Sequence, residues 1–426
     1  MLDIRLIREQ PDFVKSRLAT RGGEDVAKID EVLRVDAERR KAETALQQLN
    51  ADRKRLSKEI GGKRSRGESS EEIETRVREL GDQISLLNEQ TTAVEEQQKQ
   101  LLLGIANLPH ASAPVGKDAS ENPVVRSWGE KPALGDPVLD HVALGTRLKL
   151  FDPERAAKLS GSGFICFTGA GARLERALIQ FMLDLHTREH GYLELSPPAL
   201  VRRECMVGTT QLPKFEEEMY GLENGQLFLA PTAEVQVTNF HREEILAATE
   251  LPKKFVAYTP CFRREAGSAG RETRGIIRVH QFDKVELVKV TTPEESYAEH
   301  ESLTANAERV LQLLGLHYRV IELCTGDITF GSAKSYDIEV WSPGSRDSGT
   351  YLEVSTCSNF EDFQARRMNL RFKDAEGKNR FCHTLNGSGL ALPRLFAALI
   401  ETGQQPDGSI RIPEKLQPYF GAAEIR

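Results

Sequence analysis

The 426-residue sequence has few cysteines, no long apolar run and no excess of positive charge. Its six cysteines stand singly, without the density of a disulfide scaffold or the paired spacing of a zinc site. No segment approaches the ~20 apolar residues of a spanning helix, and the start MLDIRLIREQ lacks the apolar core of a signal peptide. We therefore expect a cytoplasmic protein with reduced thiols and no membrane association.

The net charge of −7 argues against a uniformly basic surface, but it leaves room for local basic patches. A hydrophobic content of 39% and a charged content of 28% are ordinary for a globular protein. The length is sufficient for two or three domains. A nucleic-acid partner would therefore have to bind one patch of an otherwise acidic molecule.

Two stretches, residues 29–60 and 70–105, are rich in Glu, Lys, Arg, Gln and Leu and contain no proline. In the second, a seam from Ile73 to Ile105 follows alternating steps of four and three residues, with Thr91 and Gln98 as its polar members. This is the spacing of a coiled coil. Because the turn signal GGKRSRGES separates the two stretches, they are predicted to form an antiparallel helical hairpin, which makes up most of a helical arm at residues 1–105.

A basic patch lies near the predicted turn of this hairpin, in the stretch ADRKRLSKEIGGKRSR. It is either a solvated coiled-coil face or a contact for a phosphate backbone. The second interpretation is favoured because the charges gather toward one end of the hairpin. The candidate contact residues are Arg53, Lys54, Arg55, Lys58, Lys63 and Arg64.

Residues 106–135 are rich in Pro, Gly, Ser and Asn and are predicted to be a linker that docks against the next domain. In residues 136–426, helices at about 173–190, 293–314 and 392–401 alternate with period-2 strands. Several strands are joined by short turns rather than by helices. The fold class is therefore α+β, with helices flanking a largely antiparallel sheet.

Positive charge also gathers around FRREAGSAGRETRG and the following strand, predicted at 276–290. Side chains two apart share a face, and one face carries Arg278, His280, Phe282, Lys284 and Glu286. On the preceding strand, Arg263 and Glu265 share a face. Together the two faces offer cations that can bind phosphate, an aromatic ring that can stack on a base and carboxylates that can bind an ammonium group. A salt-bridged amphipathic hairpin is the alternative, but Arg271 and Arg274 in the loop favour a nucleotide site.

Two other segments carry candidate ligand groups. In LFLAPTAEV, Thr232 and Glu234 either start a helix or bind the ammonium and hydroxyl groups of a small amino acid. In TYLEVSTCSNF, Glu353 is either a Mg²⁺ ligand or a buried salt-bridge partner. Strand alternation places Ser355 on the face of Glu353, whereas Thr356 reaches that face only if the strand bulges.

The segment NGSGLALPRLFAALIETG predicts a turn followed by a helix, with Pro393 well placed to open it. Arg394 then lies in the first helical turn, where a cation opposes the helix dipole. A bound anion such as phosphate would balance both charges, although a surface arginine remains the alternative.

These motifs closely resemble those of bacterial seryl-tRNA synthetases, which belong to class II aminoacyl-tRNA synthetases, along essentially the whole chain. GYLELSPPALV is similar to motif 1 of that class, FRRE through KVE to motif 2, and GLALPR to motif 3. The resemblance is made more specific by the helical arm and by the segments TAE, RVHQFxKVE and NGSG. Arg264, Thr356 and Pro393 stand where the family more often has serine, serine and glycine.

The resemblance implies ATP-dependent activation of L-serine with Mg²⁺, followed by transfer to tRNA(Ser), and also to tRNA(Sec), by a homodimer. The arm would grip the long variable arm of the tRNA. Arg263, Arg394 and Glu353 would carry catalysis, and Glu353 and Thr356 would hold the metal. The implied ATP site is Arg263, Glu265, Arg278, Phe282, Glu353, Ser355, Thr356 and Arg394, and the implied serine site is Thr232, Ala233, Glu234, Glu286 and Ser388.

Two alternative functions predict different sequence features. A related enzyme that loads a carrier protein should lack the basic hairpin, which is present here. A coiled-coil interaction protein with a vestigial catalytic domain should show gaps among the charged site residues. No such gap occurs among Arg263, Glu265, Glu286, Glu353 and Arg394.

Overall fold

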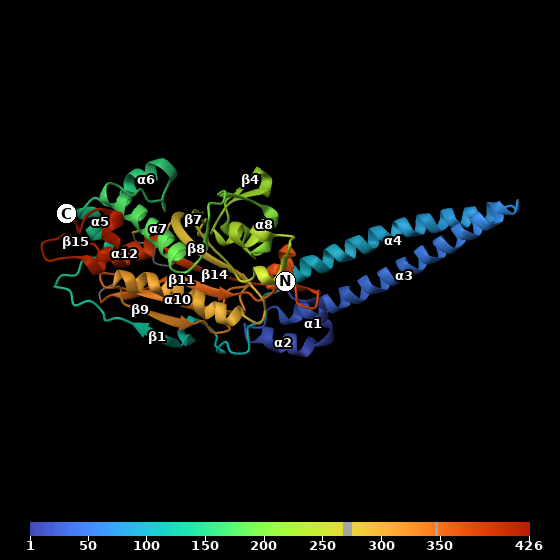
Figure 1. Ribbon diagram of the computed structural model, residues 1–426, viewed down its shortest axis with the longest axis horizontal. Helices are drawn as coiled ribbons and strands as arrows, with labels where there is room; N and C mark the ends of the chain where they lie inside the picture. The colour runs from blue at the N-terminus through green and yellow to red at the C-terminus, as the bar shows by residue number, and fades with distance from the viewer. Residues whose placement is uncertain (267–274, 346–347) are drawn as a thin grey trace. The chain divides into compact units, whose positions relative to one another are not determined.

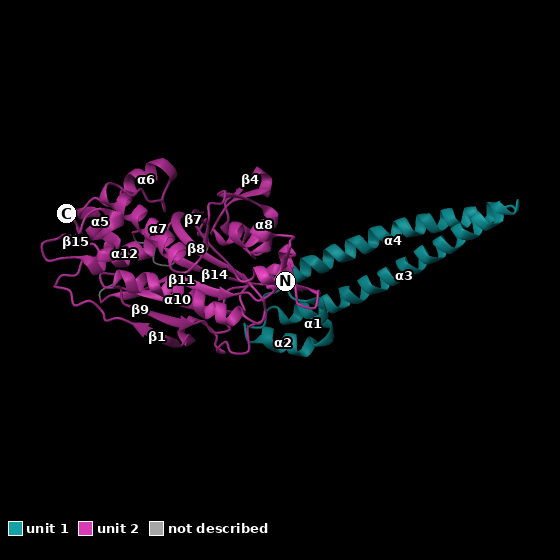
Figure 2. Cartoon of the chain, in the orientation of Figure 1, with its two compact units in different colours: residues 1–106 teal, residues 107–426 magenta. Residues whose placement is uncertain are grey.

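The computed structural model describes residues 1–266, 275–345 and 348–426. The chain divides into two compact units, residues 1–106 and 107–426 (Figure 2). The loop arginines Arg271 and Arg274 lie outside the described residues. Within the described ranges, no helix has the length and apolar character that crossing a membrane requires.

The first unit is helical, and its two longest helices run antiparallel to each other (Figure 1). The hairpin predicted from the heptad seam is confirmed. With 40 residues, the longer helix spans ~60 Å at 1.5 Å per residue. The helices are α1 (Ile4–Glu9), α2 (Pro11–Ala19), α3 (Val26–Ser65) and α4 (Glu71–Leu103).

The turn between α3 and α4 is shorter than predicted, because GGKRS continues α3 as far as Ser65. Each glycine costs an isolated helix ~1 kcal/mol relative to alanine, but a long helix that is packed along its length tolerates this cost. The reversal instead uses Gly67, whose φ of +73° is a backbone conformation that glycine adopts without strain.

The polar members of the seam are buried for a structural reason. Gln98 donates from Nε2 to Oδ1 of the buried Asp36 at 3.1 Å, which ties α4 to α3. Asp36 also accepts hydrogen bonds from Arg8 and Arg40. Burial alone would raise the pKa of Asp36, but the hydrogen bonds from Arg8 and Gln98 lower it to about 2. A buried polar contact of this kind is a known means of fixing the register of packed helices.

The second unit is built on an eight-stranded sheet with the order β1-β9-β10-β11-β14-β8-β7-β2. Neighbouring strands are antiparallel, except that β2 runs parallel to β7. This confirms the predicted α+β class. The strands are β1 (Val124–Trp128), β2 (Leu193–Leu195), β7 (Lys253–Phe262), β8 (Gln281–Thr291), β9 (Tyr318–Glu322), β10 (Lys334–Ser342), β11 (Thr350–Asn359) and β14 (His383–Ala391).

Three helices cover one face of this sheet, close to the positions predicted from the sequence: α7 (Ala170–Arg188), α10 (Ser296–Leu314) and α12 (Leu392–Gly403) (Figure 1). Their apolar sides share one core cluster with Val285, Leu287 and Val354 of the sheet. Because successive strand residues point to opposite faces, the alternate residues of β8 and β11 are left for the other face. Smaller sheets are formed by β3 (Leu200–Arg202), β4 (Gly221–Leu222) and β5 (Leu227–Leu229), and by β6 (Ile245–Ala247), β12 (Arg371–Lys373) and β13 (Asn379–Phe381).

Two segments differ from the sequence-based expectation. The strand predicted at 276–290 begins only at Gln281. The His280 carbonyl oxygen still accepts from the Arg263 N–H at 2.9 Å, but the His280 N–H donates to the Gly163 carbonyl oxygen, 2.8 Å away, so regular pairing with β7 ends there. The predicted linker at 106–135 contains a strand that was not expected, β1, which pairs with β9. Asn107 also donates to the Phe330 carbonyl oxygen, a contact of the kind expected for a linker that docks against the second unit.

Candidate functional site

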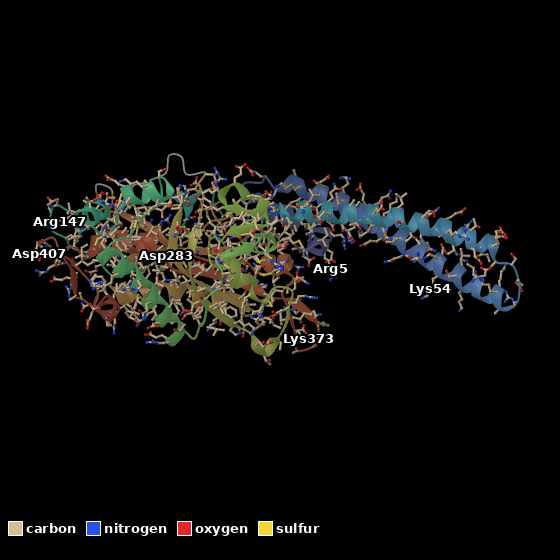
Figure 3. All side chains as sticks on the ribbon, turned by 90° about the horizontal axis from the view of Figure 1, so that it is seen from above. Arg5, Lys54, Arg147, Asp283, Lys373 and Asp407 are labelled. Carbon is tan, nitrogen blue, oxygen red and sulfur yellow. The ribbon has the colours of Figure 1, made fainter. Side chains whose placement is uncertain are left out.

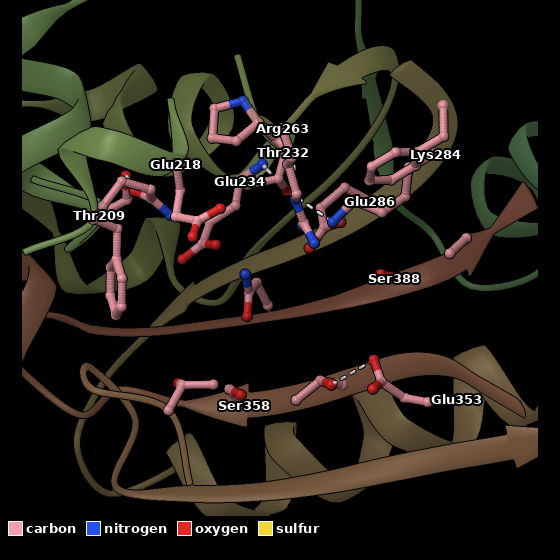
Figure 4. A pocket seen from close by; sticks show the side chains of 18 of the residues that line it. Thr209, Glu218, Thr232, Glu234, Arg263, Lys284, Glu286, Glu353, Ser358 and Ser388 are labelled. Atoms are coloured by element: carbon pink, nitrogen blue, oxygen red, sulfur yellow. Dashed lines mark hydrogen bonds and ion pairs between the residues drawn. The ribbon is translucent and has the colours of Figure 1, made fainter. Parts of the chain in front are cut away.

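A cavity of about 590 Å³ lies on the sheet face opposite α7, α10 and α12. Strands β8, β11 and β14 form its floor, and the segment before α9 (Glu234–Thr238) contributes one wall (Figure 4). Phe282, Lys284 and Glu286 alternate along β8 and all line the cavity. Strand alternation therefore predicted correctly that these three side chains share one face, even though the strand begins later than expected.

One end of the cavity is built from carboxyl, hydroxyl and amide groups. Thr232, Glu234, Glu286 and Ser388 all line it. The Thr232 hydroxyl, two residues before α9, accepts a hydrogen bond from the Glu234 backbone N–H at 3.2 Å. Glu234 is buried, and its Oε1 accepts a hydrogen bond of 2.7 Å from Gln364 on α11 (Phe363–Met368). Two buried carboxylates and two hydroxyls offer acceptors for an ammonium group and partners for a hydroxyl.

Glu234 has an unusual proton affinity. Burial, and then the neighbouring Glu286 carboxylate, raise its pKa to about 7, while the hydrogen bond from Gln364 opposes that rise. Burial and the negative charge of Glu286 both disfavour the ionised form of Glu234. A cation that enters this end would reverse the balance, so the site favours an ammonium group.

The other end of the cavity carries guanidinium groups and an aromatic ring. The Arg263 guanidinium carbon lies 5.2 Å from the centroid of the Phe282 ring, and its Nε donates to the Pro231 carbonyl oxygen at 3.3 Å. Arg278 forms an ion pair with Glu265, whose φ of +50° is uncommon for a residue other than glycine. A flat ring beside fixed cations suits a purine and its phosphates.

A third arginine lies in the first turn of α12, as predicted. Arg394 Nη1 donates to the Glu353 carbonyl oxygen at 2.7 Å and lies 3.6 Å from the Glu353 Oε2 atom. Pro393 occupies the second position of the helix, where its missing N–H costs nothing. The positive charge of Arg394 and the positive end of the α12 dipole therefore both face the cavity.

A bulge in β11 decides which hydroxyl accompanies Glu353. The register with β10 shifts between Ile338, which faces Ser355, and Glu339, which faces Glu353. Val354 is therefore an extra residue, and Thr356 comes onto the face of Glu353. The Thr356 hydroxyl donates to Glu353 Oε1 at 3.3 Å, and both side chains line the cavity.

Two predicted site residues do not lie in the cavity. Ser355 is buried, and its hydroxyl donates to the Ser388 carbonyl oxygen at 2.8 Å, because the bulge turns it away from Glu353. The methyl group of Ala233 packs in an apolar cluster with Val237 and Phe255. Neither belongs to the cavity lining.

The cavity also contains residues that sequence analysis did not assign to it. Lys284 had been placed on the correct face of β8, but without a role. Asn386 and Ser358 line the floor, and Thr209 and Phe330 line the wall beyond the carboxylates. The last two come from irregular segments, whose position depends on tertiary contacts and carries no periodic signal.

The basic residues of the arm are mostly exposed on α3, close to its turn. Lys54 and Lys58 form no ion pair with any residue in the described part of the chain (Lys54 is labelled in Figure 3). Arg55 pairs with Asp52 at 3.0 Å and Arg64 with Glu74 at 2.8 Å, whereas Arg53 is exposed and Lys63 is half-buried.

Comparisons with known proteins match both units. The family model of the seryl-tRNA synthetase N-terminal domain matches residues 1–109, and that of the tRNA synthetase class II core domain (G, H, P, S and T) matches residues 215–403. A serine–tRNA ligase of Akkermansia muciniphila is 60% identical over 426 residues, covering 100% of this chain and 99% of the relative. The crystal structure of seryl-tRNA synthetase from Pyrococcus horikoshii complexed with ATP has a TM-score of 0.91 at 40% identity, covering 100% of this chain and 99% of that one. A cytoplasmic serine–tRNA ligase from Naegleria fowleri, in complex with AMP, has a TM-score of 0.88 at 27% identity, covering 100% and 99%.

Proposed function

Because this chain belongs to the bacterial seryl-tRNA synthetase family and is a class II ligase that joins serine to tRNA, we propose specific roles for the residues of its cavity. The carboxylate end binds serine and the arginine end binds ATP. A single observation supports this assignment: one cavity is lined by buried carboxylates at one end and by arginines at the other.

In the first step, the serine carboxylate attacks the α-phosphorus of ATP and pyrophosphate leaves. The two reactants repel each other, since both are negatively charged. Arg263, between the two ends, binds the α-phosphate and stabilises the charge that develops in the transition state. Arg278 and Arg394 hold the γ-phosphate, and Phe282 stacks on the adenine, whose amino group contacts Glu265. Catalysis then comes from positioning and fixed charge, without a covalent intermediate on a side chain.

Glu353 and Thr356 are the residues that fit Mg²⁺. Among the described residues there is no cluster of three or more His, Cys, Asp or Glu side chains arranged for a metal ion. One carboxylate with one hydroxyl is a hard-oxygen pair of the kind that holds Mg²⁺ together with substrate phosphates. When bound, the ion would neutralise charge on the phosphates. Ser355 is not included, because its hydroxyl is already bonded to the Ser388 carbonyl oxygen.

Serine is transferred in the second step to the terminal adenosine of tRNA(Ser), and of tRNA(Sec) by the same recognition. We propose that Arg53, Lys54, Arg55, Lys58, Lys63 and Arg64 contact the backbone of the long variable arm. All of them except the half-buried Lys63 are exposed near the turn of the hairpin, which supports this role. We further propose that the enzyme works as a cytoplasmic homodimer through the motif 1 segment, where Leu193 and Leu200 are exposed.

The assignment is tested by serine-dependent exchange of labelled pyrophosphate into ATP. Purified protein should catalyse this exchange with serine and not with alanine or glycine. It should then charge tRNA(Ser) transcripts. If none of the twenty amino acids supports exchange, the proposed function is wrong.

The pH dependence of serine activation should follow Glu234. Serine binding needs its carboxylate, so protonation removes the ammonium acceptor, and kcat/KM for serine should fall as pH drops through about 7, tenfold per unit. The groups that surround Glu234 are Glu286 and Lys284 from β8, Gln364 from α11 and Asn386 from β14. Exchange kinetics at saturating ATP between pH 5.5 and 8.5 measure the profile. A flat profile across this range would contradict the role of Glu234.

A further inference from the structure

Lys284 is a buried cation that links groups in the serine end of the cavity. Its Nζ donates to the Thr232 hydroxyl oxygen at 2.8 Å and forms an ion pair with the Glu286 carboxylate (Figure 4). The side chains of Lys284 and Glu286 are only 8% and 2% exposed. A buried ammonium group on β8 therefore contacts one residue from the wall and one from the floor of the same subsite.

The contact with Lys284 determines what the Thr232 hydroxyl can do. A hydroxyl has two acceptor positions and one proton to donate. Lys284 Nζ and the Glu234 N–H, at 2.8 and 3.2 Å, occupy the two acceptor positions of Thr232 Oγ1. The proton has no acceptor among the described residues, and Thr232 lines the cavity. In this arrangement the Thr232 hydroxyl has its proton left to donate toward the ligand.

The same lysine holds an acceptor next to this donor. Apart from Lys284, no side chain in the described ranges forms a hydrogen bond or an ion pair with the Glu286 carboxylate. Glu286 keeps acceptor positions for the ligand, while Lys284 balances its charge. Glu234 is left as the carboxylate that receives the substrate ammonium. A donor and an acceptor side by side match a hydroxyl group, which both accepts and donates.

We propose that Lys284 is a positioning residue for substrate selection: it holds the Thr232 hydroxyl as a donor beside the Glu286 carboxylate as an acceptor, and this pair selects an amino acid that carries a hydroxyl. The inference rests on the proposed serine site and deepens it. A site built around a substrate hydroxyl rejects the analogue without one by as much as 10⁴- to 10⁵-fold. Without Lys284, Thr232 can rotate and Glu286 lacks its counter-charge, so this discrimination should fall.

The test compares full-length wild type with Lys284→Met and Lys284→Arg in pyrophosphate exchange with serine and with alanine. Lys284→Met should raise KM for serine about 100-fold and lower the serine-to-alanine ratio of kcat/KM about 100-fold, while KM for ATP stays within threefold. Lys284→Arg retains the cation and should recover part of the ratio. Unchanged KM for ATP shows that the cavity is still folded.

A matched control separates substrate selection from stability. Lys289 is a second buried lysine on β8, bonded to Glu299 and Ser302 and absent from the cavity lining. Lys289→Met should lower the melting temperature and leave the serine-to-alanine ratio unchanged.

The proposal is overturned if Lys284→Met keeps that ratio within threefold of wild type. If this variant does not fold, Thr232→Val and Thr232→Ser decide the question, since only serine keeps the donor: equal ratios in both overturn the proposal. A wild type without serine-dependent exchange would instead refute the proposed function.

Discussion

Replacing Arg263 with alanine is expected to lower kcat/KM for serine-dependent pyrophosphate exchange about 1,000-fold, or ~4 kcal/mol of transition-state stabilisation. Arg263 is the guanidinium that lines the cavity beside Phe282 and is anchored on the Pro231 carbonyl oxygen. In the proposed arrangement, its charge faces the position where the carboxylate meets the α-phosphate. Because that charge matters most when the new bond forms, kcat should fall more than the affinity for ATP.

Arg263→Lys should recover only part of the loss, because an ammonium group cannot reproduce the planar pair of donors. The adjacent Arg264 is the matched control. It is absent from the cavity lining, and its backbone N–H bonds to the Glu218 carbonyl oxygen. Arg264→Ala should stay within about twofold of wild type, as surface substitutions commonly do. Activity of Arg263→Ala within tenfold of wild type would remove Arg263 from the mechanism.

Neutralising Arg53, Lys54 and Lys58 together should lower kcat/KM for charging tRNA(Ser) by about 100-fold at physiological salt, while pyrophosphate exchange stays unchanged. These side chains are exposed on α3 near its turn. A phosphate-backbone contact contributes little beyond charge, so each lost contact should flatten the dependence of log K on log salt by ~0.7 to 0.9. Filter binding of tRNA across a salt series measures this slope.

Transcripts without the long variable arm provide the decisive comparison. Wild type should bind the shortened transcript as weakly as the triple variant binds the complete one. The triple variant should lose little further affinity when the variable arm is removed. Arg34 and Lys41, which are exposed on α3 far from its turn, are the control pair, and their replacement by alanine should change charging by less than threefold. Equal charging of both transcripts by wild type would falsify the proposed role of the arm.

The helical hairpin and the charged face of β8 were predictable because they depend on local periodicity. The seam from Ile73 to Ile105 follows the heptad spacing, which can be read from the sequence without knowing the tertiary contacts. The polar residue Gln98 lies in this seam, and the helix continues through it. Alternation along β8 placed Phe282, Lys284 and Glu286 together for the same reason. Where the sequence signal was weaker, at the turn of the hairpin and the start of β8, long-range hydrogen bonds and helix cooperativity moved the boundaries.

What the sequence determined by itself is the set of chemical groups and their faces: three arginines, the acidic residues of the serine end, an aromatic ring and a basic arm. Tertiary structure decided their partners. The bulge at Val354 selected Thr356 over Ser355, and the packing of β8 against the wall before α9 brought Lys284 to Thr232, 52 residues away in the chain. Register shifts and contacts between distant segments depend on the packing of the whole sheet, so no local pattern of residues encodes them.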